Sequence, residues 1–470
     1  MISQQATVPP SSALHVGVPL KPEVQAEEGI ISSEDCGREQ FSSALVATSV
    51  RVQQVIVSKR PIDIPVELWW KVIDFAADEI LWYKNGRTQM RVLARVSRAW
   101  YTQCRRRAEE RLDVLMRSKK EVYRLIRRLE ENPERCGAIK RVHFVNEKIN
   151  TFGSIAVRMA GKLPQVETLT LSCDRSIHSY FCDWDAGQLH THVFLHVRVA
   201  FESVTTLDLF EVRFPSAMVF GRLVCALPRL TSLTCELVEF KQPSVAPSPG
   251  PSLLRLGAVN LADSPHIVDF LLETRAGAFL RHITYSGSVE ACSRLVAVAA
   301  PSLSSLHFTP ARYKFQVNHD PESSPDLLPD LMPAQALCVL SVSLSPYSKF
   351  DPRQLASALP RASLPNLREI EITAWVSVNV KFDALDSESY AQIDKVFSGR
   401  QFPLLRKVTF HLRCEVALSK VMDVISAVTW RTHLSSKIPL LHASGRLLAP
   451  VSVVVREKRE YEEYEHDFSS

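Results

Sequence analysis

Glycine is scarce in this chain: 15 of the 470 residues are glycine, against 28 prolines. Neither GxxxxGK[ST] nor GxGxxG occurs, and both motifs need glycine to bring the backbone close to a phosphate group. The scarcity therefore argues against the common glycine-rich nucleotide-binding loops. The many prolines, spread along the chain, indicate recurrent turns.

Long apolar runs and a strong net charge are also missing. No run approaches the roughly 18–20 apolar residues of a membrane-spanning helix. The first residues, MISQQATVPPSSALHVGVPLKPE, lack the charged start and apolar core of a secretion signal. The 56 basic and 51 acidic residues leave a net charge of +5, too small for a general nucleic-acid footprint. We therefore expect a cytoplasmic or nuclear protein with neither a membrane nor a nucleic acid as its partner.

The ten cysteines include no CxxC pair, so free and mostly buried thiols are the simplest expectation in a reducing compartment. No GxSxG motif is present, and no cysteine stands in a recognisable activating context. We therefore expect that the chain is not an enzyme and that it carries no cofactor.

Residues 1–58 are rich in Ser, Pro, Gln and Glu and have little periodicity, so we expect most of them to be disordered. Residues 59–107 form a helical module. Its first helix begins at Pro65, a residue that a helix tolerates only in its first turn. This helix carries a broad apolar face at spacings of four, four and three, with Trp69, Ile73 and Ala76 beside it: Ile64, Leu68, Val72 and Phe75.

A second stripe in the same module indicates another amphipathic helix. Its members follow at spacings of three, four, three and four: Met90, Leu93, Ser97, Trp100 and Cys104. Residues 108–135 carry a linking helix, with the capping-box pattern of Ser118 and Glu121, and Asn132-Pro133 ends the helix. Two or three short helices cannot bury their apolar faces alone, so the module needs a partner surface.

Beyond this point the chain repeats itself loosely. Each unit has a turn residue followed by apolar residues at +2, +5 and +7, as in LPQVETLTL with Val166, Leu169 and Leu171. The units start at 137, 164, 202, 228, 251, 278, 301, 335, 365 and 403, and helix-like stretches precede many of them. The spacing places the +5 and +7 residues on one face of a strand, and the residue between them on the other.

This period predicts an α/β fold in which residues 136–450 form a curved leucine-rich-repeat solenoid, with parallel strands and helical returns. Each unit can bury its apolar face only against its neighbours. Loops are expected near 241–251 and 312–333, and a charged tail at 451–470. An ordinary α/β domain with coincidental leucine spacing is the alternative.

Two stretches could carry other chemistry. The segment 173–196 brings together possible zinc ligands, but no known zinc spacing fits: Cys173, His178, Cys182, Asp183, Asp185, His190, His192 and His196. A loop followed by a repeat helix explains the segment more simply. In residues 104–128 acidic residues interleave with Arg and Lys, which favours a solvated helix face over a phosphate site.

Residues 61–107 resemble an F-box. That family opens with a Leu/Ile-Pro pair, continues with Glu-Leu and an apolar helix, and closes near Val-Ser-x-x-Trp. The matching positions stand in order here: Ile64-Pro65, Glu67-Leu68, Ile73, Val96-Ser97 and Trp100. The linker DEILWYKNGRTQM between the two stripes is longer and more polar than is usual in the family. The repeats behind it resemble the irregular leucine-rich repeats often attached to F-boxes, particularly in fungi.

The resemblance implies the substrate-recognition subunit of a Skp–cullin–F-box ubiquitin ligase. The F-box would dock the Skp adaptor, and through it a cullin, while the repeats hold an unidentified protein substrate. The implied adaptor-binding residues, with Trp69 added from its place beside the stripe, are Ile64, Pro65, Leu68, Trp69, Ile73, Val96, Ser97 and Trp100. A protein-interaction scaffold outside any ligase and a metal-dependent hydrolase built on 173–196 are the alternatives.

Overall fold

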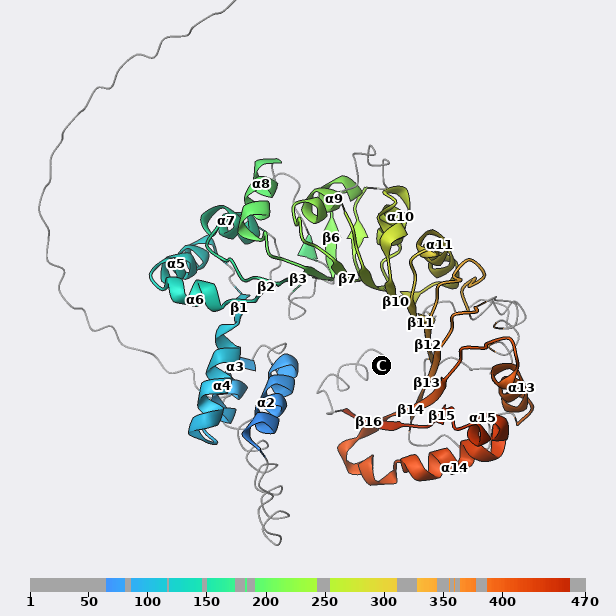
Figure 1. The fold of residues 1–470 in the computed structure, drawn as a ribbon. Helices are drawn as coiled ribbons and strands as arrows, with labels where there is room; N and C mark the ends of the chain where they lie inside the picture. The colour runs from blue at the N-terminus through green and yellow to red at the C-terminus, as the bar shows by residue number, and fades with distance from the viewer. Residues whose placement is uncertain are drawn as a thin grey trace, which may run out of the picture. The chain divides into compact units, whose positions relative to one another are not determined.

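A computed structural model gives the fold of this chain (Figure 1). It describes residues 65–80, 86–115, 118–145, 150–173, 182–183, 191–242, 254–310, 328–344, 355, 359, 364–377 and 387–456. The chain divides into two compact units, Met1–Trp69 and Trp70–Ser470. Of the first unit only residues 65–69, at the start of helix α2, are described, so the prediction of disorder over 1–58 lies outside the described residues.

Three helices make up the N-terminal module: α2 (Val66–Ile80), α3 (Gly86–Leu93) and α4 (Arg98–Glu109). Helix α2 begins directly after Pro65, as predicted. The module has a small core of its own, in which Ile73 and Ala77 of α2 pack with Met90 and Cys104. None of the helices that the structure describes is long and apolar enough to cross a membrane.

The second predicted helix of the module is in fact two helices. Helix α3 ends at Leu93, and α4 begins at Arg98 with Ser97 as its N-cap. The Ser97 Oγ accepts a hydrogen bond from the backbone N–H of Trp100 at 3.2 Å, which satisfies a donor that the first turn leaves free. The apolar spacing therefore continues across a helix break because the residues on both sides face the same small core.

A 13-stranded sheet dominates the rest of the chain, and all its strand pairs are parallel. Its strands are β1 (Arg111–Val114), β2 (Arg141–Val145), β3 (Thr168–Ser172), β5 (Thr206–Phe210), β7 (Ser232–Glu236), β9 (Ala258–Ala262), β10 (His282–Gly287), β11 (Ser305–Pro310), β12 (Val339–Leu344), β13 (Glu369–Ser377), β14 (Lys407–Ala417), β15 (Leu447–Leu448) and β16 (Val451–Arg456). Neighbours in the sheet follow the order of the chain, and both β15 and β16 pair with β14. The predicted α/β architecture with parallel strands is confirmed, and it is compatible with a curved repeat solenoid.

In the described part of the chain, the helices between the strands cover one face of this sheet and leave the other face open (Figure 1). They are α5 (Lys119–Glu130), α6 (Pro133–Ala138), α7 (Asn150–Arg158), α8 (Thr191–Ala200), α9 (Ala217–Cys225), α10 (Pro265–Glu273), α11 (Val289–Ala299), α13 (Ser387–Ser398), α14 (Ala427–Lys437) and α15 (Pro439–Ala443), with 3₁₀ turns η2 (Ala276–Phe279) and η5 (Leu418–Asp423). Helix α5 carries the predicted capping box of Ser118 and Glu121.

The repeat pattern fixes which strand residues are buried. Leu169 and Leu171 of β3 are buried against the helices, and Val166 is buried just before the strand. Strands pair residue for residue, so Leu169 lies between Val142 of β2 and Leu207 of β5. The apolar residues at +5 thus form one continuous row through the sheet, and those at +7 form a second row. One core runs behind both rows.

The predicted repeat at 251 is out of register. It placed Ala258 in the core, whereas β9 pairs Val259 with Leu233 and Leu261 with Cys235. Leu256 is buried before the strand, so it takes the place that Leu230 has in the preceding unit. The unit therefore starts three residues later than predicted. The segment LLRLGAV fits the repeat pattern in two registers, and only the pairing with β7 shows which register the chain adopts.

Both ends of the sheet extend beyond the predicted repeats. The helix expected over 108–132 begins only at Lys119, because Arg111–Val114 form strand β1, the first strand of the sheet. At the other end Val451–Arg456 form β16, where the start of a charged tail was expected. A separate three-stranded sheet also lies outside the predicted repeats: β4 (Cys182–Asp183), β6 (Val212–Phe214) and β8 (Glu239–Phe240).

The C-terminal helices are held by a buried carboxylate. Asp394 of α13 accepts backbone hydrogen bonds from Leu440 and Leu441, both at 2.8 Å, at the start of α15. The side chain is 3% exposed. Helix N-termini leave such N–H groups without partners inside the helix, so Asp394 both satisfies them and ties α15 to α13.

We expect Asp394→Ala to lower the free energy of unfolding by about 3 kcal/mol, because two charge-assisted hydrogen bonds are lost together. Scanning calorimetry of the full chain measures the change as a lower Tm. Gln392→Ala, on the exposed side of the same helix, is the matched control and should leave the Tm unchanged. Equal Tm values for the two variants would contradict the role given to Asp394.

Candidate functional site

The structure places the predicted adaptor-binding residues in three different environments. Pro65, Leu68, Val96 and Ser97 are exposed, and Trp69 and Trp100 are half-buried. Ile73 is fully buried in the core of the module, so it supports the helix and presents no contact surface. Ile64 lies outside the described residues. The predicted adaptor-binding residues thus include both surface residues and residues that hold the surface in place.

An apolar face of α2 remains uncovered within the described part of the chain. Leu68 is 48% exposed, Val72 50% and Phe75 76%, and they lie at spacings of four and three along the helix. We call these three residues the α2 face. Val72 and Phe75 belong to the predicted stripe but not to the predicted site. Because the stripe spans more than one side of the helix, the sequence could not separate Phe75, which is exposed, from Ile73, which is buried.

The side of α2 that carries Asp74 and Asp78 is fixed by ion pairs and hydrogen bonds. Gln103 donates a hydrogen bond to Asp74 at 2.7 Å, and Arg107 pairs with both aspartates. Arg141 of β2 pairs with Asp78 at 2.7 Å. These contacts orient α2 so that Val72 and Phe75 stay outside the core of the module.

The basic helix region forms ion pairs of two kinds. Arg105–Glu109 and Arg127–Glu131 are exposed pairs one helical turn apart, as the interpretation of a solvated face requires. Arg107 is different, because its side chain is 14% exposed and pairs with Glu110 at 2.7 Å. Part of the predicted solvated face therefore belongs to the packing between α4 and α2.

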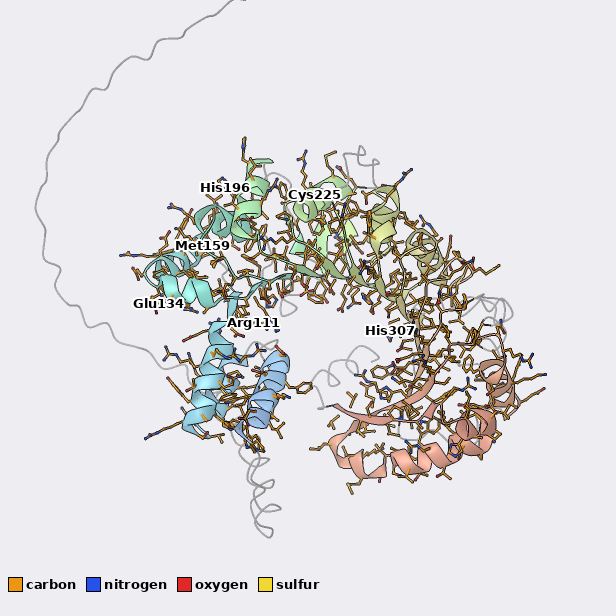
Figure 2. All side chains as sticks on the ribbon, viewed as in Figure 1. Arg111, Glu134, Met159, His196, Cys225 and His307 are labelled. Carbon is orange, nitrogen blue, oxygen red and sulfur yellow. The ribbon has the colours of Figure 1, made fainter. Side chains whose placement is uncertain are left out.

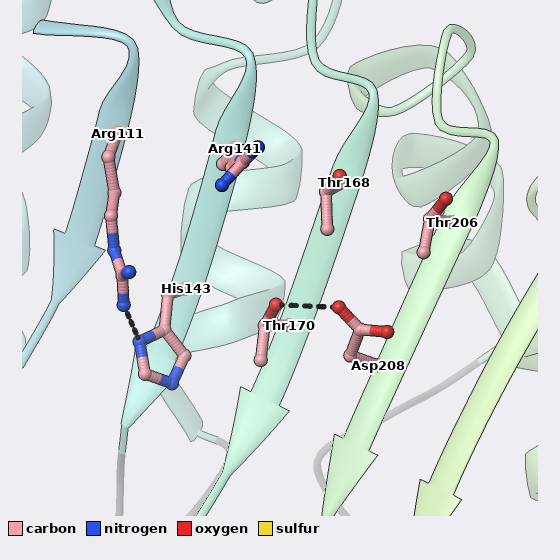
Figure 3. A pocket seen from close by; sticks show the side chains of 7 residues that line it. All are labelled: Arg111, Arg141, His143, Thr168, Thr170, Thr206 and Asp208. Carbon is pink, nitrogen blue, oxygen red and sulfur yellow. Dashed lines mark hydrogen bonds between the residues drawn. The ribbon is translucent and has the colours of Figure 1, made fainter. Parts of the chain in front are cut away.

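The open face of the sheet carries a small pocket over β1, β2, β3 and β5 (Figure 3). Its volume is about 180 Å³. The register places two rows of side chains side by side across these strands. The first row is Arg111, Arg141, Thr168 and Thr206, and the second is Asp113, His143, Thr170 and Asp208. All of these except Asp113 line the pocket.

One edge of the pocket is a compensated charge network. The buried Arg111 guanidinium donates to Asp113 at 2.7 Å and contacts the His143 Nδ1 at 2.9 Å. The His143 Nε2 in turn lies 2.8 Å from the Ser172 hydroxyl. Burial alone would raise the pKa of Asp113, but the hydrogen bond with His143 and the charge of Arg111 outweigh it and lower the pKa. Asp113 is therefore held as a carboxylate.

The opposite edge carries a carboxylate with weaker charge compensation. Asp208 of β5 accepts a hydrogen bond from the Thr170 hydroxyl at 3.3 Å. Burial raises its pKa above the ordinary value, and hydrogen bonds from two threonines together with the charges of His143 and Arg141 only partly offset that effect. Among the residues that the structure describes, no Lys or Arg lies within ion-pair distance of Asp208. A desolvated carboxylate on an open sheet face is typical of a binding site rather than of a structural ion pair.

The far end of the open face presents a cation–π pair. The Arg413 guanidinium of β14 lies 4.1 Å from the centre of the Trp375 ring of β13. Next to it, His411 contacts Glu371 and the Ser452 hydroxyl. Trp and Arg are enriched among the residues that dominate protein–protein binding energy, so this pair is a candidate anchor for a protein partner.

The predicted zinc candidates do not come together in the described ranges. No group of three His, Cys, Asp or Glu residues that could hold a metal occurs in the part of the chain that the structure describes. His192 and His196 are exposed on α8, and His196 lies on the helical side of the sheet, whereas Arg111 and His307 lie on the open side (Figure 2). His178, Asp185 and His190 are outside the described residues.

No family model matches the sequence, and no curated protein matches it. Among solved structures, the chain has a likeness to one described as the crystal structure of the TLR13–ssRNA13 complex. The identity is 14%, the match covers 61% of this chain and 28% of that chain, and the TM-score is 0.21. A TM-score this low carries neither fold nor function across, so the repeat architecture rests on the strand pairing described above.

Asp208 in the pocket and Asp113 beside it should respond to mutation in opposite ways. Asp113 has a lowered pKa, so its contribution to stability is present at neutral pH and is lost as the pH falls below the ordinary value of 3.8. Asp208 has a raised pKa, so the folded state favours its protonated form and loses stability as the pH rises from 3.8.

We therefore expect Asp208→Asn to raise the Tm at neutral pH, and this gain should shrink on acidification. Asp113→Asn should lower the Tm at neutral pH, because the buried Arg111 guanidinium loses its counter-charge. Thermal unfolding of both variants across a pH series provides the measurement. A lower Tm for Asp208→Asn at neutral pH would show that Asp208 is a structural residue.

Proposed function

We propose that this chain is the substrate-recognition subunit of a Skp–cullin–F-box ubiquitin ligase. In this proposal the module of α2, α3 and α4 docks the Skp adaptor, which connects it to a cullin. The repeat sheet holds a protein substrate. The ordered Ile-Pro, Glu-Leu and Val-Ser-x-x-Trp positions support the docking half of the proposal through the resemblance to an F-box.

The exposed α2 face is the observation that carries the proposal. A single exposed leucine needs no explanation, but Leu68, Val72 and Phe75 form a row along one helix. A row at this spacing suits the docking of a helix into an apolar groove, where residues one turn apart act as anchors. Because Ile73 is buried and Asp74 and Asp78 are held by polar contacts, the row stays exposed in a fixed position even when no partner is bound. Less conformational entropy is then lost on binding.

The open sheet face supports the second half of the proposal. It offers amide and charged side chains at the strand positions between the buried rows, such as Asn260 and Glu371. Such a surface suits the recognition of another protein by hydrogen bonds and charge. The receptor would contribute proximity between its substrate and a ubiquitin-carrying enzyme, and the chemistry would belong to partner proteins.

We expect Phe75→Asp to weaken binding to the purified Skp adaptor at least tenfold, because a charge would replace the most exposed anchor of the α2 face. Lys71→Ala, an exposed polar position on the same helix, should bind like the wild type. Since Phe75 lies outside the core, the Tm of the Phe75→Asp variant should equal that of the wild type. Isothermal titration calorimetry measures the affinity.

Failure of the wild-type chain to bind the adaptor would overturn the ligase proposal. A protein-interaction scaffold acting outside a ligase would then be the better interpretation, because both surfaces would remain. Binding that is unaffected by Phe75→Asp and by Leu68→Asp would show that the adaptor uses another part of the chain.

A further inference from the structure

The helical side of the sheet presents a surface of its own, apart from the open face (Figure 2). Helices α5, α7, α8 and α9 lie in a row there, and each contacts the next. Each of them presents large apolar side chains that are between 44% and 60% exposed: Tyr123 of α5, Val157 of α7, Leu195 and Val199 of α8, and Met218 of α9. We call these five residues the outer row.

Every helix of the outer row also carries an exposed arginine next to the apolar residue or one turn away from it. These arginines are Arg124 of α5, Arg158 of α7, Arg198 of α8 and Arg222 of α9. None of the four forms an ion pair within the described part of the chain. Arg158 lies 5.9 Å from the centre of the Tyr123 ring, and it acts on Glu130 through its charge alone. The four guanidinium groups are therefore available to a partner.

Acidic residues do not balance these arginines locally. Helices α7, α8 and α9 contain no Asp or Glu. The two acids of α5 are already engaged, because Glu121 caps its own helix and Glu130 pairs with Lys162 at 2.7 Å. The exposed Glu167 and Glu202 lie outside the helices, in the turns that lead to β3 and β5. The outer row is thus an apolar surface flanked by charge of one sign.

The pattern ends at the next two helices of the same side. Neither α10 nor α11 has a large apolar side chain among its exposed residues. Helix α10 contains Asp269 and Glu273, and Arg294 of α11 pairs with Asp269 at 2.9 Å. Helices α10 and α11 show how this fold builds a solvated surface, with polar residues and compensated charge. The outer row departs from that arrangement on both counts, which is typical of an interaction surface.

Helix geometry sets the size of a partner that covers the whole row. Packed helices lie about 8–10 Å apart, so the distance from α5 to α9 is about 24–30 Å. An α-helix rises about 1.5 Å per residue, so about 16–20 residues span that distance. Two helical turns advance about 10.8 Å, which matches the step from one helix of the row to the next. A crossing helix would therefore place apolar residues two turns apart on successive members of the row.

We propose that the outer row binds an acidic amphipathic helix of a protein partner. The apolar side of that helix packs on the outer row, and its Asp and Glu side chains pair with the four flanking arginines. An anionic membrane fits less well, because the layer of helices covers about half of each apolar side chain. Too little remains to insert about 5–10 Å into a bilayer, as membrane-surface helices do. The proposal is independent of the ligase function, which uses other surfaces.

Fluorescence anisotropy of labelled synthetic peptides with the full-length chain tests the proposal. The first peptide is a helix of about 20 residues with leucine along one side and glutamate elsewhere. The second has the same composition in an order without an apolar side, and the third has lysine in place of glutamate. We expect the first peptide to bind at least tenfold more tightly than either of the others, because the surface offers both apolar contacts and positive charge.

Variants of the chain locate the binding surface. Leu195→Ser and Arg198→Glu should each weaken binding of the acidic amphipathic peptide at least tenfold, because they remove an apolar contact and reverse a charge of the row. Arg431→Glu is the matched control and should bind like the wild type. It makes the same charge change at an exposed arginine of α14, another helix without acidic residues. All three positions are exposed, so an unchanged Tm separates lost binding from unfolding.

Several results would overturn the proposal: no binding of the acidic amphipathic peptide, equal binding of the reordered peptide, or unchanged affinity in both Leu195→Ser and Arg198→Glu. Vesicles of phosphatidylserine and phosphatidylcholine provide the other arm of the test. If they bind the wild type but not Arg198→Glu, and the peptide does not bind, the surface is a membrane site instead. Adaptor binding by Arg198→Glu, measured in parallel, should equal that of the wild type. Peptide binding without adaptor binding would leave this proposal standing and remove the ligase function.

Discussion

Residue-for-residue pairing of parallel strands is the constraint on which the rest of this structure depends. Each strand shares its register with both neighbours, so a residue type at one repeat position becomes a row across the sheet. The rows of Leu169 and Leu171 are buried because no single unit can cover its own apolar face. The row between them points to the opposite face of the sheet, because successive side chains of a strand alternate between its two faces. Buried and functional surfaces are therefore set by the same pairing.

An open sheet has two edge strands, and the helical module contacts the first of them, β1. Among the strands that the structure describes, β1 pairs with β2 alone, so its outer edge presents carbonyl groups without a strand partner there. Arg87 of α3 donates to the Arg111 carbonyl at 2.7 Å. The module thus protects an edge that could otherwise pair with another chain, while the α2 face remains exposed. Packing against the sheet and the proposed docking of an adaptor use different sides of the same helices.

The sequence predicted the repeated part of the fold well because the leucine spacing there is a direct consequence of strand burial. The prediction failed where the same residues fit two different structures. Arg111–Val114 follow a helix without a turn signal, and Ala258 satisfies the leucine spacing as well as Val259 does. The β-branched run in Val451–Arg456 did carry a strand signal, but the charged residues after it suggested a tail.

The candidate sites were harder to predict than the fold for a physical reason. Val72 and Phe75 could be identified as apolar but not as exposed, because exposure depends on which side of α2 meets Met90 and Cys104. Arg141 and Asp208 are far apart in the sequence, and only the pairing of β2 and β5 with β3 brings them to one pocket. Nothing in a single strand distinguishes Asp208 from a solvated aspartate.

Two aspartates of this fold, Asp394 buried and Asp208 half-buried, show why burial by itself does not identify a functional residue. Asp394 is the more deeply buried, yet both its oxygens accept backbone N–H groups, and its charge balances the start of α15. Asp208 is more exposed, and its hydrogen-bond partner is a hydroxyl, while Arg141 and His143 act on it only through their charges. The first arrangement stabilises the folded chain whether or not a partner is bound. The second leaves a half-buried carboxylate without a close cation, so a positive charge from a partner would stabilise Asp208 more than it would stabilise Asp394.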